Sequence, residues 1–462
     1  MGEAQPLKLE AGRASQSPSD NPGSSGASRL LDILYLGAGF LLIPFFLYRR
    51  LIKGKSSAPW RSKLGYSTPR AAGKPRVWIH AVSVGEAMAA ETLIKQLRQR
   101  RAGVEIVVST TTTTGQETAV KRYGAENVFY YPMDLSGAVR RTLDRVQPAV
   151  IVLMELEVWP NMTAEAAARG IPVIVVNGRI TERSAPRYKK FWRLAGPGFQ
   201  RVRRWLVQSD EYAQRFASLG VDPARIEVSG NIKYDAVDTT PPDEAQRTSL
   251  RANLGLPASA QVIIGGSTHP SEEAELLKAY AQLRATLPGV RLVLVPRHPE
   301  RIQSVEAEIA AAGLGVIRRS AIRDKGVEAC VGALNPAQRD GWVLLVDTVG
   351  ELKQLYAIAD VAFIGGSLIP HGGQNVMEPC GMGVAVVHGP HMHNFKDAMA
   401  ILDSSKGSIE VSRETLRAEI EKLLRNPDQA RAMASRAREG FIKAQGATKR
   451  AVDYVCELLG RT

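Results

Sequence analysis

The sequence predicts an α/β protein with two domains, each built on a parallel sheet, and three observations carry that prediction. From about residue 75, apolar runs of strand length alternate with amphipathic stretches of helix length. This rhythm stops at residues 236–248, where AVDTTPPDEAQRT contains a Pro-Pro pair and little apolar content, and then restarts. A chain of 462 residues with 44% apolar content is also long enough for two ordinary cores.

The individual elements follow from the positions of these runs. In the first half we predict strands at 77–82, 105–110, 150–155, 173–177 and 205–209, with helices between them, for example at 86–100, 161–169 and 210–219. In the second half we predict strands at 262–267, 291–296, 342–347, 360–366 and 384–389, with helices at 271–286, 299–312, 351–358 and through 413–460. Strands that alternate with helices pair in parallel and are covered on both faces. Residues 319–341 show no core pattern and are predicted to be an exposed loop.

The N-terminal residues predict a tail followed by a membrane anchor. Residues 1–28 are rich in Ser, Gly, Pro and Ala, which is typical of disorder. The run LLDILYLGAGFLLIPFFLY at 30–48 is close to the ~20 apolar residues that span a bilayer. Arg49 and Arg50 follow at once, so the flank after the run is predicted to be cytoplasmic. We therefore expect a membrane-anchor helix at 29–50, and the sequence leaves open whether it spans the bilayer or lies in the interface.

The charge of the chain is concentrated in its first half. The net charge is +14, and residues 1–250 hold 35 Lys and Arg against 23 Asp and Glu. Between Asp32 and Glu86 there is no acidic residue, while nine basic residues occur there. Such a block attracts a polyanion, either nucleic acid or an anionic membrane surface. Because the apolar run lies beside it, we expect an anionic membrane surface, and no nucleic acid.

Several chemistries are disfavoured by what the sequence lacks. The three cysteines, Cys330, Cys380 and Cys456, are far apart and none lies in a CxxC pair, which argues against a disulfide framework and a structural zinc site. There is no GxxxxGK[ST] phosphate loop, and there is no GxGxxG fingerprint with a downstream acid. We predict no metal site and no cofactor.

The string HAVSVGE, at residues 80–86, is the most informative motif. It follows a predicted strand and precedes a predicted helix, so Glu86 falls in the first helical turn, where the dipole favours a negative charge. The carboxyl end of a parallel strand is where open α/β sheets place ligand chemistry. Glu86 is therefore either a general base or only a cap of its own helix.

The predicted strand ends of the second half carry a different chemistry. GGSTH, PRHPER, DTVGEL and GGSLIPHGGQNVMEP each join a strand end to glycines or helix-starting polar residues. Glycine-rich turns expose N–H groups to phosphate oxygens, and Arg297 adds a fork of donors. All seven histidines also lie at or just after predicted strand ends, so together they indicate one functional edge.

With these motifs in view, the chain resembles the 3-deoxy-D-manno-octulosonic acid (Kdo) transferases, lipid A-specific enzymes of lipopolysaccharide core biosynthesis. The resemblance runs from about residue 30 and rests on ten motifs in order: HAVSVGE, STTTTTG, MELEVWPN, NGRITERSAPRY, GNIKYD, PRHPER, DTVGEL, GGSL, GGQNVMEP and GPHMHNFKD. Each motif is weak alone, and their order makes the resemblance specific.

The resemblance implies a glycosyltransferase B architecture of two facing Rossmann-like domains with an N-terminal membrane anchor. It implies an acceptor domain for the lipid A precursor, then a donor domain for CMP-Kdo, and a location on the cytoplasmic side of the inner membrane. The expected boundaries are a tail (1–28), anchor (29–50), acceptor domain (51–235), linker (236–248), donor domain (249–440) and a last helix that crosses back (441–462).

The resemblance also implies roles for single residues. Glu86 matches the catalytic base of the family, acting in one inverting displacement. The CMP contacts match Pro296, Arg297, Val349, Gly350, Glu351, Asn375, Val376, Met377 and Glu378, with Ser267 and Gly366 as neighbours. On the acceptor side we expect Glu155, Glu157, Trp159, Asn161, Arg179 and Arg183.

Three other functions stay open at this point. One is a glycosyltransferase of the same fold that uses a UDP-sugar. Another is a membrane-anchored nucleic-acid binder, although the basic block has only Trp60 and Tyr66 as interleaved aromatic residues. The third is a catalytically silent lipid-binding scaffold.

Overall fold

The computed structural model describes residues 31–33, 35, 37, 59–66, 68, 69 and 73–460. The predicted tail, and the predicted anchor apart from five of its positions, lie outside the described residues. Within the described ranges, no helix combines the length and the apolar character needed to cross a bilayer.

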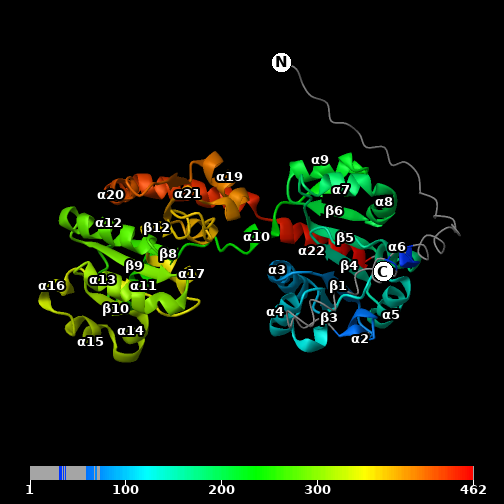
Figure 1. Cartoon of the computed structure of the whole chain (residues 1–462), viewed down its shortest axis with the longest axis horizontal. Coiled ribbons are helices and arrows are strands. Elements are labelled where there is room, and N and C mark those ends of the chain that lie inside the picture. Colours follow the sequence, from blue (N-terminus) through cyan, green and yellow to red (C-terminus); the bar gives the residue numbers. More distant parts are fainter. Residues whose placement is uncertain are drawn as a thin grey trace, which may run out of the picture. The chain divides into compact units, whose positions relative to one another are not determined.

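The chain divides into two compact units, one formed by Met1–Val228 with Val452–Thr462 and the other by Ser229–Ala451. The described part of each unit is built on one parallel sheet of seven strands (Figure 1). The division at Val228 precedes the stretch predicted as a linker, and α11 (Glu244–Asn253) begins inside that stretch. The last helix, α22 (Ala447–Gly460), starts in the second unit and ends in the first.

The sheet of the first unit has the strand order β3-β2-β1-β4-β5-β6-β7. Its strands are β1 (Arg76–His80), β2 (Glu105–Thr110), β3 (Val128–Tyr130), β4 (Val150–Met154), β5 (Val173–Gly178), β6 (Arg204–Val207) and β7 (Ile226–Val228). Its helices are α2 (Trp60–Lys63), α3 (Val84–Arg100), α4 (Thr113–Tyr123), α5 (Ser136–Val146), α6 (Pro160–Ala168), α7 (Ala185–Lys190), α8 (Trp192–Arg201) and α9 (Asp210–Ser218).

The sheet of the second unit has the strand order β10-β11-β9-β8-β12-β13-β14. Its strands are β8 (Gln261–Thr268), β9 (Val290–Pro296), β10 (Val316–Arg318), β11 (Val343–Leu345), β12 (Val361–Ile364), β13 (Ala385–His388) and β14 (Ser408–Glu410). Besides α11, its helices include α10 (Ile232–Asp235), α12 (Glu272–Thr286), α13 (Ile302–Ala311), α17 (Leu352–Leu355), α18 (Met377–Gly381), α19 (Lys396–Ser405), α20 (Leu416–Arg425) and α21 (Pro427–Ala444).

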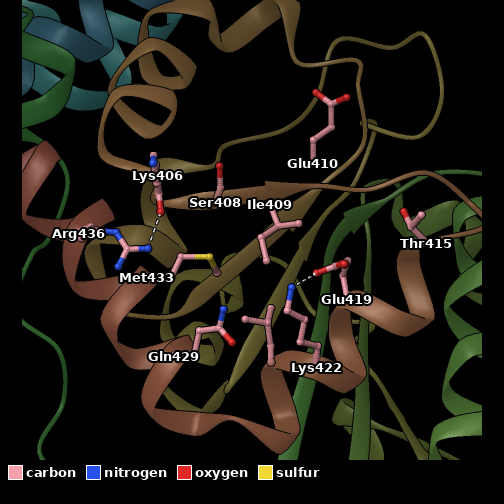
Figure 2. Close-up of a pocket in the computed structure, with 11 residues that line it drawn as sticks. Lys406, Ser408, Ile409, Glu410, Thr415, Glu419, Lys422, Gln429, Met433 and Arg436 are labelled. Atoms are coloured by element: carbon pink, nitrogen blue, oxygen red, sulfur yellow. Dashed lines mark hydrogen bonds and ion pairs between the residues drawn. The ribbon is translucent and has the colours of Figure 1, made fainter.

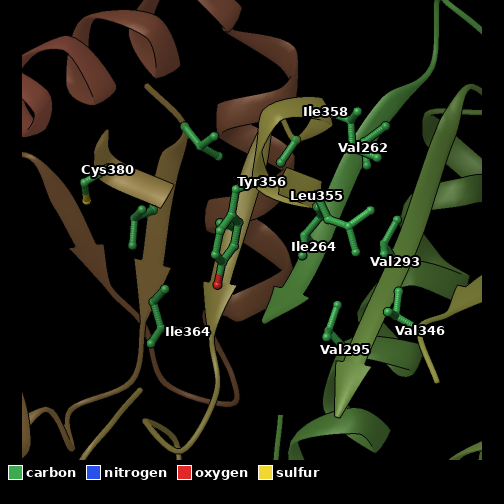
Figure 3. Packing of buried hydrophobic residues seen from close by; sticks show 14 of the residues in the cluster. Val262, Ile264, Val293, Val295, Val346, Leu355, Tyr356, Ile358, Ile364 and Cys380 are labelled. Atoms are coloured by element: carbon green, nitrogen blue, oxygen red, sulfur yellow. The ribbon is translucent and has the colours of Figure 1, made fainter. Parts of the chain in front are cut away.

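The central strands are buried on both faces, which explains their nearly continuous apolar sequences. Every residue of β1, β4 and β12 is buried. Figure 3 shows one face of the second sheet, where Val262 and Ile264 of β8 belong to the same apolar cluster as Val293 and Val295 of β9. Such close packing fixes the positions of the strand ends. The loops that follow the strands therefore start from rigid positions.

The prediction of an exposed loop at 319–341 is wrong. These residues form three short helices, α14 (Arg319–Lys325), α15 (Val327–Gly332) and α16 (Pro336–Arg339). Ile322 is buried in the core, and Val327 and Val331 pack against the same cluster. The apolar residues are too sparse to form a clear stripe, because they are divided between short helices, with Ile322 in α14 and Val327 and Val331 in α15.

Candidate active site

Both sheets reverse their strand order at one point, and open α/β sheets bind ligands outside the strand ends there. In the first unit this point lies between β1 and β4, and in the second unit it lies between β8 and β12. The residues that follow these strands at their carboxyl ends are therefore the first candidates for a site in each unit.

Glu86 lies in the first turn of α3, soon after β1. Its N–H donates to Oγ of Ser83, the N-cap residue, at 3.3 Å. Its carboxylate accepts hydrogen bonds from Ser83 Oγ at 2.8 Å and from the Val82 N–H at 2.9 Å. The helix is capped by Ser83, and the two hydrogen bonds to the Glu86 carboxylate hold it close to the end of β1. Burial raises the pKa of Glu86 above its ordinary value of 4.5, and the two hydrogen bonds oppose that rise.

Two more carboxyl groups and one guanidinium share this corner of the first unit. Glu155, directly after β4, has a φ of 60°, a strained conformation that is concentrated at functional sites. Its Oε2 accepts a hydrogen bond from Arg179 Nε at 2.7 Å. Burial, together with the negative charges of Glu86 and Glu155, raises the pKa of Glu157 to about 7. The structure therefore places two further carboxyl groups, Glu155 and Glu157, in electrostatic coupling with the predicted base.

The other residues predicted for the acceptor side have different surroundings. Asn161 is fully buried and its Nδ2 donates to the backbone oxygen of Asp134 at 2.6 Å, so it serves the structure. The ring of Trp159 lies 6.0 Å from that of Tyr131, at the edge of the apolar core. Arg183 is exposed and makes no hydrogen bond or ion pair to the part of the chain that the structure describes.

The sequence indicated that all seven histidines mark one functional edge. The structure contradicts this for two of them. His80 is fully buried, its Nδ1 lies 2.8 Å from Ser109 Oγ, and burial lowers its pKa to about 3. His388 is also buried, with its Nε2 at 3.2 Å from Ser408 Oγ. Both are neutral core residues, because burial disfavours the charged imidazolium.

Three other histidines do come together, at the strand ends of the second unit. The ring of His269 lies 4.2 Å from that of His371 and 5.7 Å from that of His298. Burial and the positive charges of its neighbours, Arg297 among them, lower the pKa of His269 to about 4. Gln374 Nε2 lies 3.1 Å from His269 Nε2 and fixes the ring. This surface is therefore suited to an anion.

A buried acid that the sequence did not single out organises this edge. Glu272, in the first turn of α12, is fully buried. Its carboxylate accepts hydrogen bonds from the backbone N–H groups of Gly366 (2.7 Å), Ser367 (3.0 Å), Leu368 (3.0 Å) and His269 (3.0 Å). Glu272 thereby ties the loop after β12 to the loop after β8. Its place just after the STH segment was the only sequence signal for it.

The nucleotide contacts predicted by resemblance fall on three strand-end loops of the second unit. Pro296 ends β9, and the exposed Arg297 follows with no hydrogen bond or ion pair from its guanidinium to any described residue. Val349 is 82% exposed, and Gly350 has a φ of 92° that favours glycine. Glu351 accepts a hydrogen bond from Arg319 Nε at 2.8 Å.

The third loop precedes α18. Asn375 Oδ1 accepts from the Met377 N–H at 3.0 Å, and Asn375 Nδ2 donates to Glu378 Oε1 at 2.9 Å. Burial raises the pKa of Glu378. Val376 is fully buried in the core and so supports the loop rather than presenting its side chain. The loop is ordered by its own amide and carboxylate, which can also meet hydroxyl groups of a ligand.

A cavity of about 400 Å³ lies elsewhere in the second unit, beside β14 and between α20 and α21 (Figure 2). It contains none of the predicted site residues. Its Arg436 already donates to the Lys406 carbonyl at 2.9 Å, and Lys422 pairs with Glu419 at 3.5 Å. Across the described residues, no group of three or more His, Cys, Asp or Glu side chains is arranged to hold a metal ion.

These features define the class of the fold as two α/β units, each built on a parallel sheet with a candidate site at its strand ends. A solved glycosyltransferase from Rickettsia africae has the same fold, with a TM-score of 0.51 and 13% identity over 84% of this chain and 100% of that chain. The family model of 3-deoxy-D-manno-octulosonic-acid transferase matches residues 58–236.

Two curated relatives align over most of the chain. The 3-deoxy-D-manno-octulosonic acid transferase of Bordetella pertussis is 35% identical over 87% of this chain and 92% of its own length. The one of Haemophilus influenzae is 33% identical over 83% of this chain and 87% of its own length. The chain belongs to the 3-deoxy-D-manno-octulosonic acid (Kdo) transferase family.

Proposed function

We propose that the protein is an inverting glycosyltransferase that moves Kdo from CMP-Kdo to a lipid A precursor in lipopolysaccharide biosynthesis. The observation that carries the proposal is the position of Glu86. Its carboxylate is held at the end of β1 by two hydrogen bonds, and its pKa is raised. A carboxylate with a raised pKa is a better proton acceptor than an ordinary glutamate.

In the proposed mechanism Glu86 removes the proton from an acceptor hydroxyl as that oxygen attacks the anomeric carbon of Kdo. A new carbon–oxygen bond forms on one face while the bond from that carbon to the phosphate oxygen breaks on the other. CMP leaves with the electron pair, and the anomeric configuration inverts. Glu86 ends the step as a neutral carboxylic acid.

The donor belongs to the second unit in this proposal. Arg297 supplies a guanidinium that is paired with no described side chain, and this group faces the CMP phosphate, which gains charge as the bond breaks. Pro296, Val349 to Glu351 and Asn375 to Glu378 surround the rest of the nucleotide. The proposal needs no metal or cofactor, because the leaving group is a phosphate monoester that donors of the protein can stabilise.

In this proposal the first unit binds the acceptor and contacts the membrane. Its excess of basic residues suits a phosphorylated lipid at an anionic membrane surface. The apolar run at 30–48 followed by Arg49 and Arg50 favours a single N-terminal anchor in the inner membrane, with both units on the cytoplasmic side.

A transfer assay tests the proposal. The purified full-length protein in detergent is incubated with CMP-Kdo, generated in situ, and a tetra-acylated lipid A precursor, and mass spectrometry detects the product. We expect the mass of one or more Kdo units to be added. Glu86→Gln should lower the rate by about 10²–10⁴-fold, since removal of a general base has effects of this size.

The control is Glu91→Gln, which changes an exposed carboxylate of the same helix and should leave the rate unchanged. CMP, and not UDP, should inhibit the wild-type protein. Full activity in Glu86→Gln would rule out the assigned base. Inhibition by UDP alone would point instead to a UDP-sugar donor.

A further inference from the structure

The glutamate that follows Glu272 is also buried, and its partner lies on another strand-end loop of the second unit. Glu273 lies in the first turn of α12. Its Oε1 accepts a hydrogen bond from Nη1 of Arg301 at 2.6 Å, and its Oε2 accepts one from Nη2 at 3.4 Å. Both oxygens of the carboxylate are therefore bonded to the guanidinium, and this two-point contact is the most specific geometry of an arginine–carboxylate pair.

This ion pair is largely shielded from water. The Glu273 side chain has no exposed surface, and only 17% of the Arg301 side chain is exposed. An ionised carboxylate is stable at a buried position only where a partner compensates its lost hydration, so breaking the pair on one side is strongly unfavourable. Glu308, the other acid near Arg301, lies 3.9 Å from Nη2. The Glu273–Arg301 pair is therefore a fixed point of the unit.

The ion pair fixes one end of the loop that carries Arg297. Strand β9 ends at Pro296, and a 3-10 turn over Pro299–Arg301 leads from the loop into α13. At the other end of the loop, the Arg297 N–H donates to the Thr268 carbonyl at 3.0 Å. The loop is thus bonded to the end of β8 where it begins and to α12 where it ends.

The two arginines of this loop differ in what their guanidinium groups contact. That of Arg301 is bonded to Glu273, whereas that of the exposed Arg297 makes no hydrogen bond or ion pair to any described residue. A ligand that binds a side chain on a loose loop must also order the loop, and this ordering reduces the affinity. The ion pair removes that loss for Arg297, because it fixes the backbone a few residues away.

We infer that the Glu273–Arg301 ion pair positions Arg297 for the nucleotide phosphate and so sets the affinity of the second unit for CMP. The inference rests on the proposed function, in which Arg297 binds the CMP phosphate. Glu273 and Arg301 are positioning residues in this role, since they act through the loop. Together with Glu272, which joins the loops after β8 and β12, Glu273 lets one turn of α12 hold three strand-end loops.

A double-mutant cycle tests this role. Glu273→Met and Arg301→Met are introduced together, because removing both partners leaves no unpaired buried charge and apolar side chains of similar length fill the space. Isothermal titration calorimetry of the full-length protein in detergent then measures the affinity for CMP. The wild type and the double variant are each measured with and without Arg297→Gln.

We expect the double variant to bind CMP about tenfold more weakly than the wild type. Arg297→Gln should lower the affinity about tenfold in the wild type and less than about twofold in the double variant, where Arg297 is no longer held in place. Equal losses in both backgrounds would overturn the inference and leave the proposed nucleotide site intact. A wild type that does not bind CMP, or binds it equally well with Arg297→Gln, would overturn the assigned phosphate contact and the inference with it.

Two further variants separate positioning from a general loss of structure. Glu275→Met with Arg413→Met removes a more exposed ion pair of the same helix, and it should retain the wild-type affinity and the full effect of Arg297→Gln. Arg301→Lys keeps the charge beside Glu273 without the planar fork, so its affinity for CMP should be intermediate. If circular dichroism shows that the double variant does not fold, the cycle is run with Arg301→Lys. Wild-type affinity there, with an undiminished effect of Arg297→Gln, would contradict the inference.

Discussion

Glu86 and Glu272 occupy equivalent places in the two units, and their surroundings differ. Each lies in the first turn of the helix that follows the first strand of its sheet at the switch point. Glu272 is fully buried and accepts four backbone hydrogen bonds. Glu86 is half-buried and accepts two. The fold provides the same position twice, and the number of satisfied lone pairs separates a structural carboxylate from one that can still take a proton.

The neighbours of the two glutamates differ in charge as well. Around Glu86 lie two further carboxyl groups, Glu155 and Glu157, and burial raises the pKa of both Glu86 and Glu157. Around the loops that Glu272 joins lie His269, His371 and Arg297. The first edge suits a neutral hydroxyl that must lose a proton, and the second suits an anion. Strand-end side chains, rather than topology, decide this difference.

We expect the largest effect from a substitution of Glu272, and it tests whether this residue differs in role from Glu86. Glu272→Gln replaces the carboxylate that faces four N–H groups by an amide, which accepts fewer and weaker hydrogen bonds. Buried hydrogen bonds to a charged acceptor are stronger than those to a neutral one. We expect a loss of about 3 kcal/mol in the free energy of unfolding, against about 1 kcal/mol for Glu86→Gln, whose carboxylate accepts only two hydrogen bonds. Urea denaturation followed by circular dichroism measures both.

Glu275→Gln is the control, because it removes only an ion pair near the surface of the same helix, with Arg413. Such pairs contribute about 1 kcal/mol or less. Amide hydrogen exchange at residues 366–368 should accelerate in Glu272→Gln alone. Equal stability losses in Glu272→Gln and Glu86→Gln would mean that the count of hydrogen bonds does not separate the two roles.

The next largest effect concerns the strand-end surface of the second unit that suits an anion. Arg297→Gln removes a guanidinium that is not paired with any described side chain, so its charge is available to a ligand. We expect the affinity for CMP to fall about tenfold, which corresponds to about 1.4 kcal/mol. Isothermal titration calorimetry with CMP measures the change, and Arg323→Gln, which alters an exposed arginine, is the control. Glu86→Gln should bind CMP like the wild type, and a loss there would place the nucleotide differently.

The strands that could be predicted from the sequence are the central ones. All ten strands expected from apolar runs are present, because strands buried on both faces need continuous Val, Ile and Leu. The four strands that were missed, β3, β7, β10 and β14, have three residues each and lie at the edges of the two sheets. Edge strands are kept short and need little apolar sequence, so they leave no pattern to detect.

The candidate sites were predictable where a motif also fixes a place in the fold. HAVSVGE placed Glu86 at a strand end, and the structure gives it that position. The role of Glu272 could not be predicted, because three of its four hydrogen-bond donors come from residues almost a hundred positions away in the sequence. The separation of buried from clustered histidines had the same cause, since burial is decided by packing that a single sequence does not reveal.

The smallest expected effect concerns the carboxyl groups around Glu86 in the first unit. The pKa of Glu157 is about 7, so this carboxyl is mostly neutral below that pH and mostly ionised above it. Once ionised, it adds a negative charge beside Glu86 and makes Glu86 a stronger base. The transfer rate of the wild type should therefore rise between pH 6 and 8, roughly one unit on either side of this pKa. In Glu157→Gln that step should disappear, with a rate change of only a few-fold at pH 8.

The same residue gives an opposite trend in stability, which separates charge from simple loss of structure. Because the pKa of Glu157 is raised on folding, the native state binds more protons than the unfolded state between about pH 4.5 and 7, and stability falls as the pH rises through that window. Glu157→Gln should flatten this decline, while Glu117→Gln, at an exposed site on α4, should retain it. If the rate and stability profiles of Glu157→Gln both matched those of the wild type, Glu157 would not belong to the carboxyl cluster. Glu86 would then be coupled to Glu155 alone.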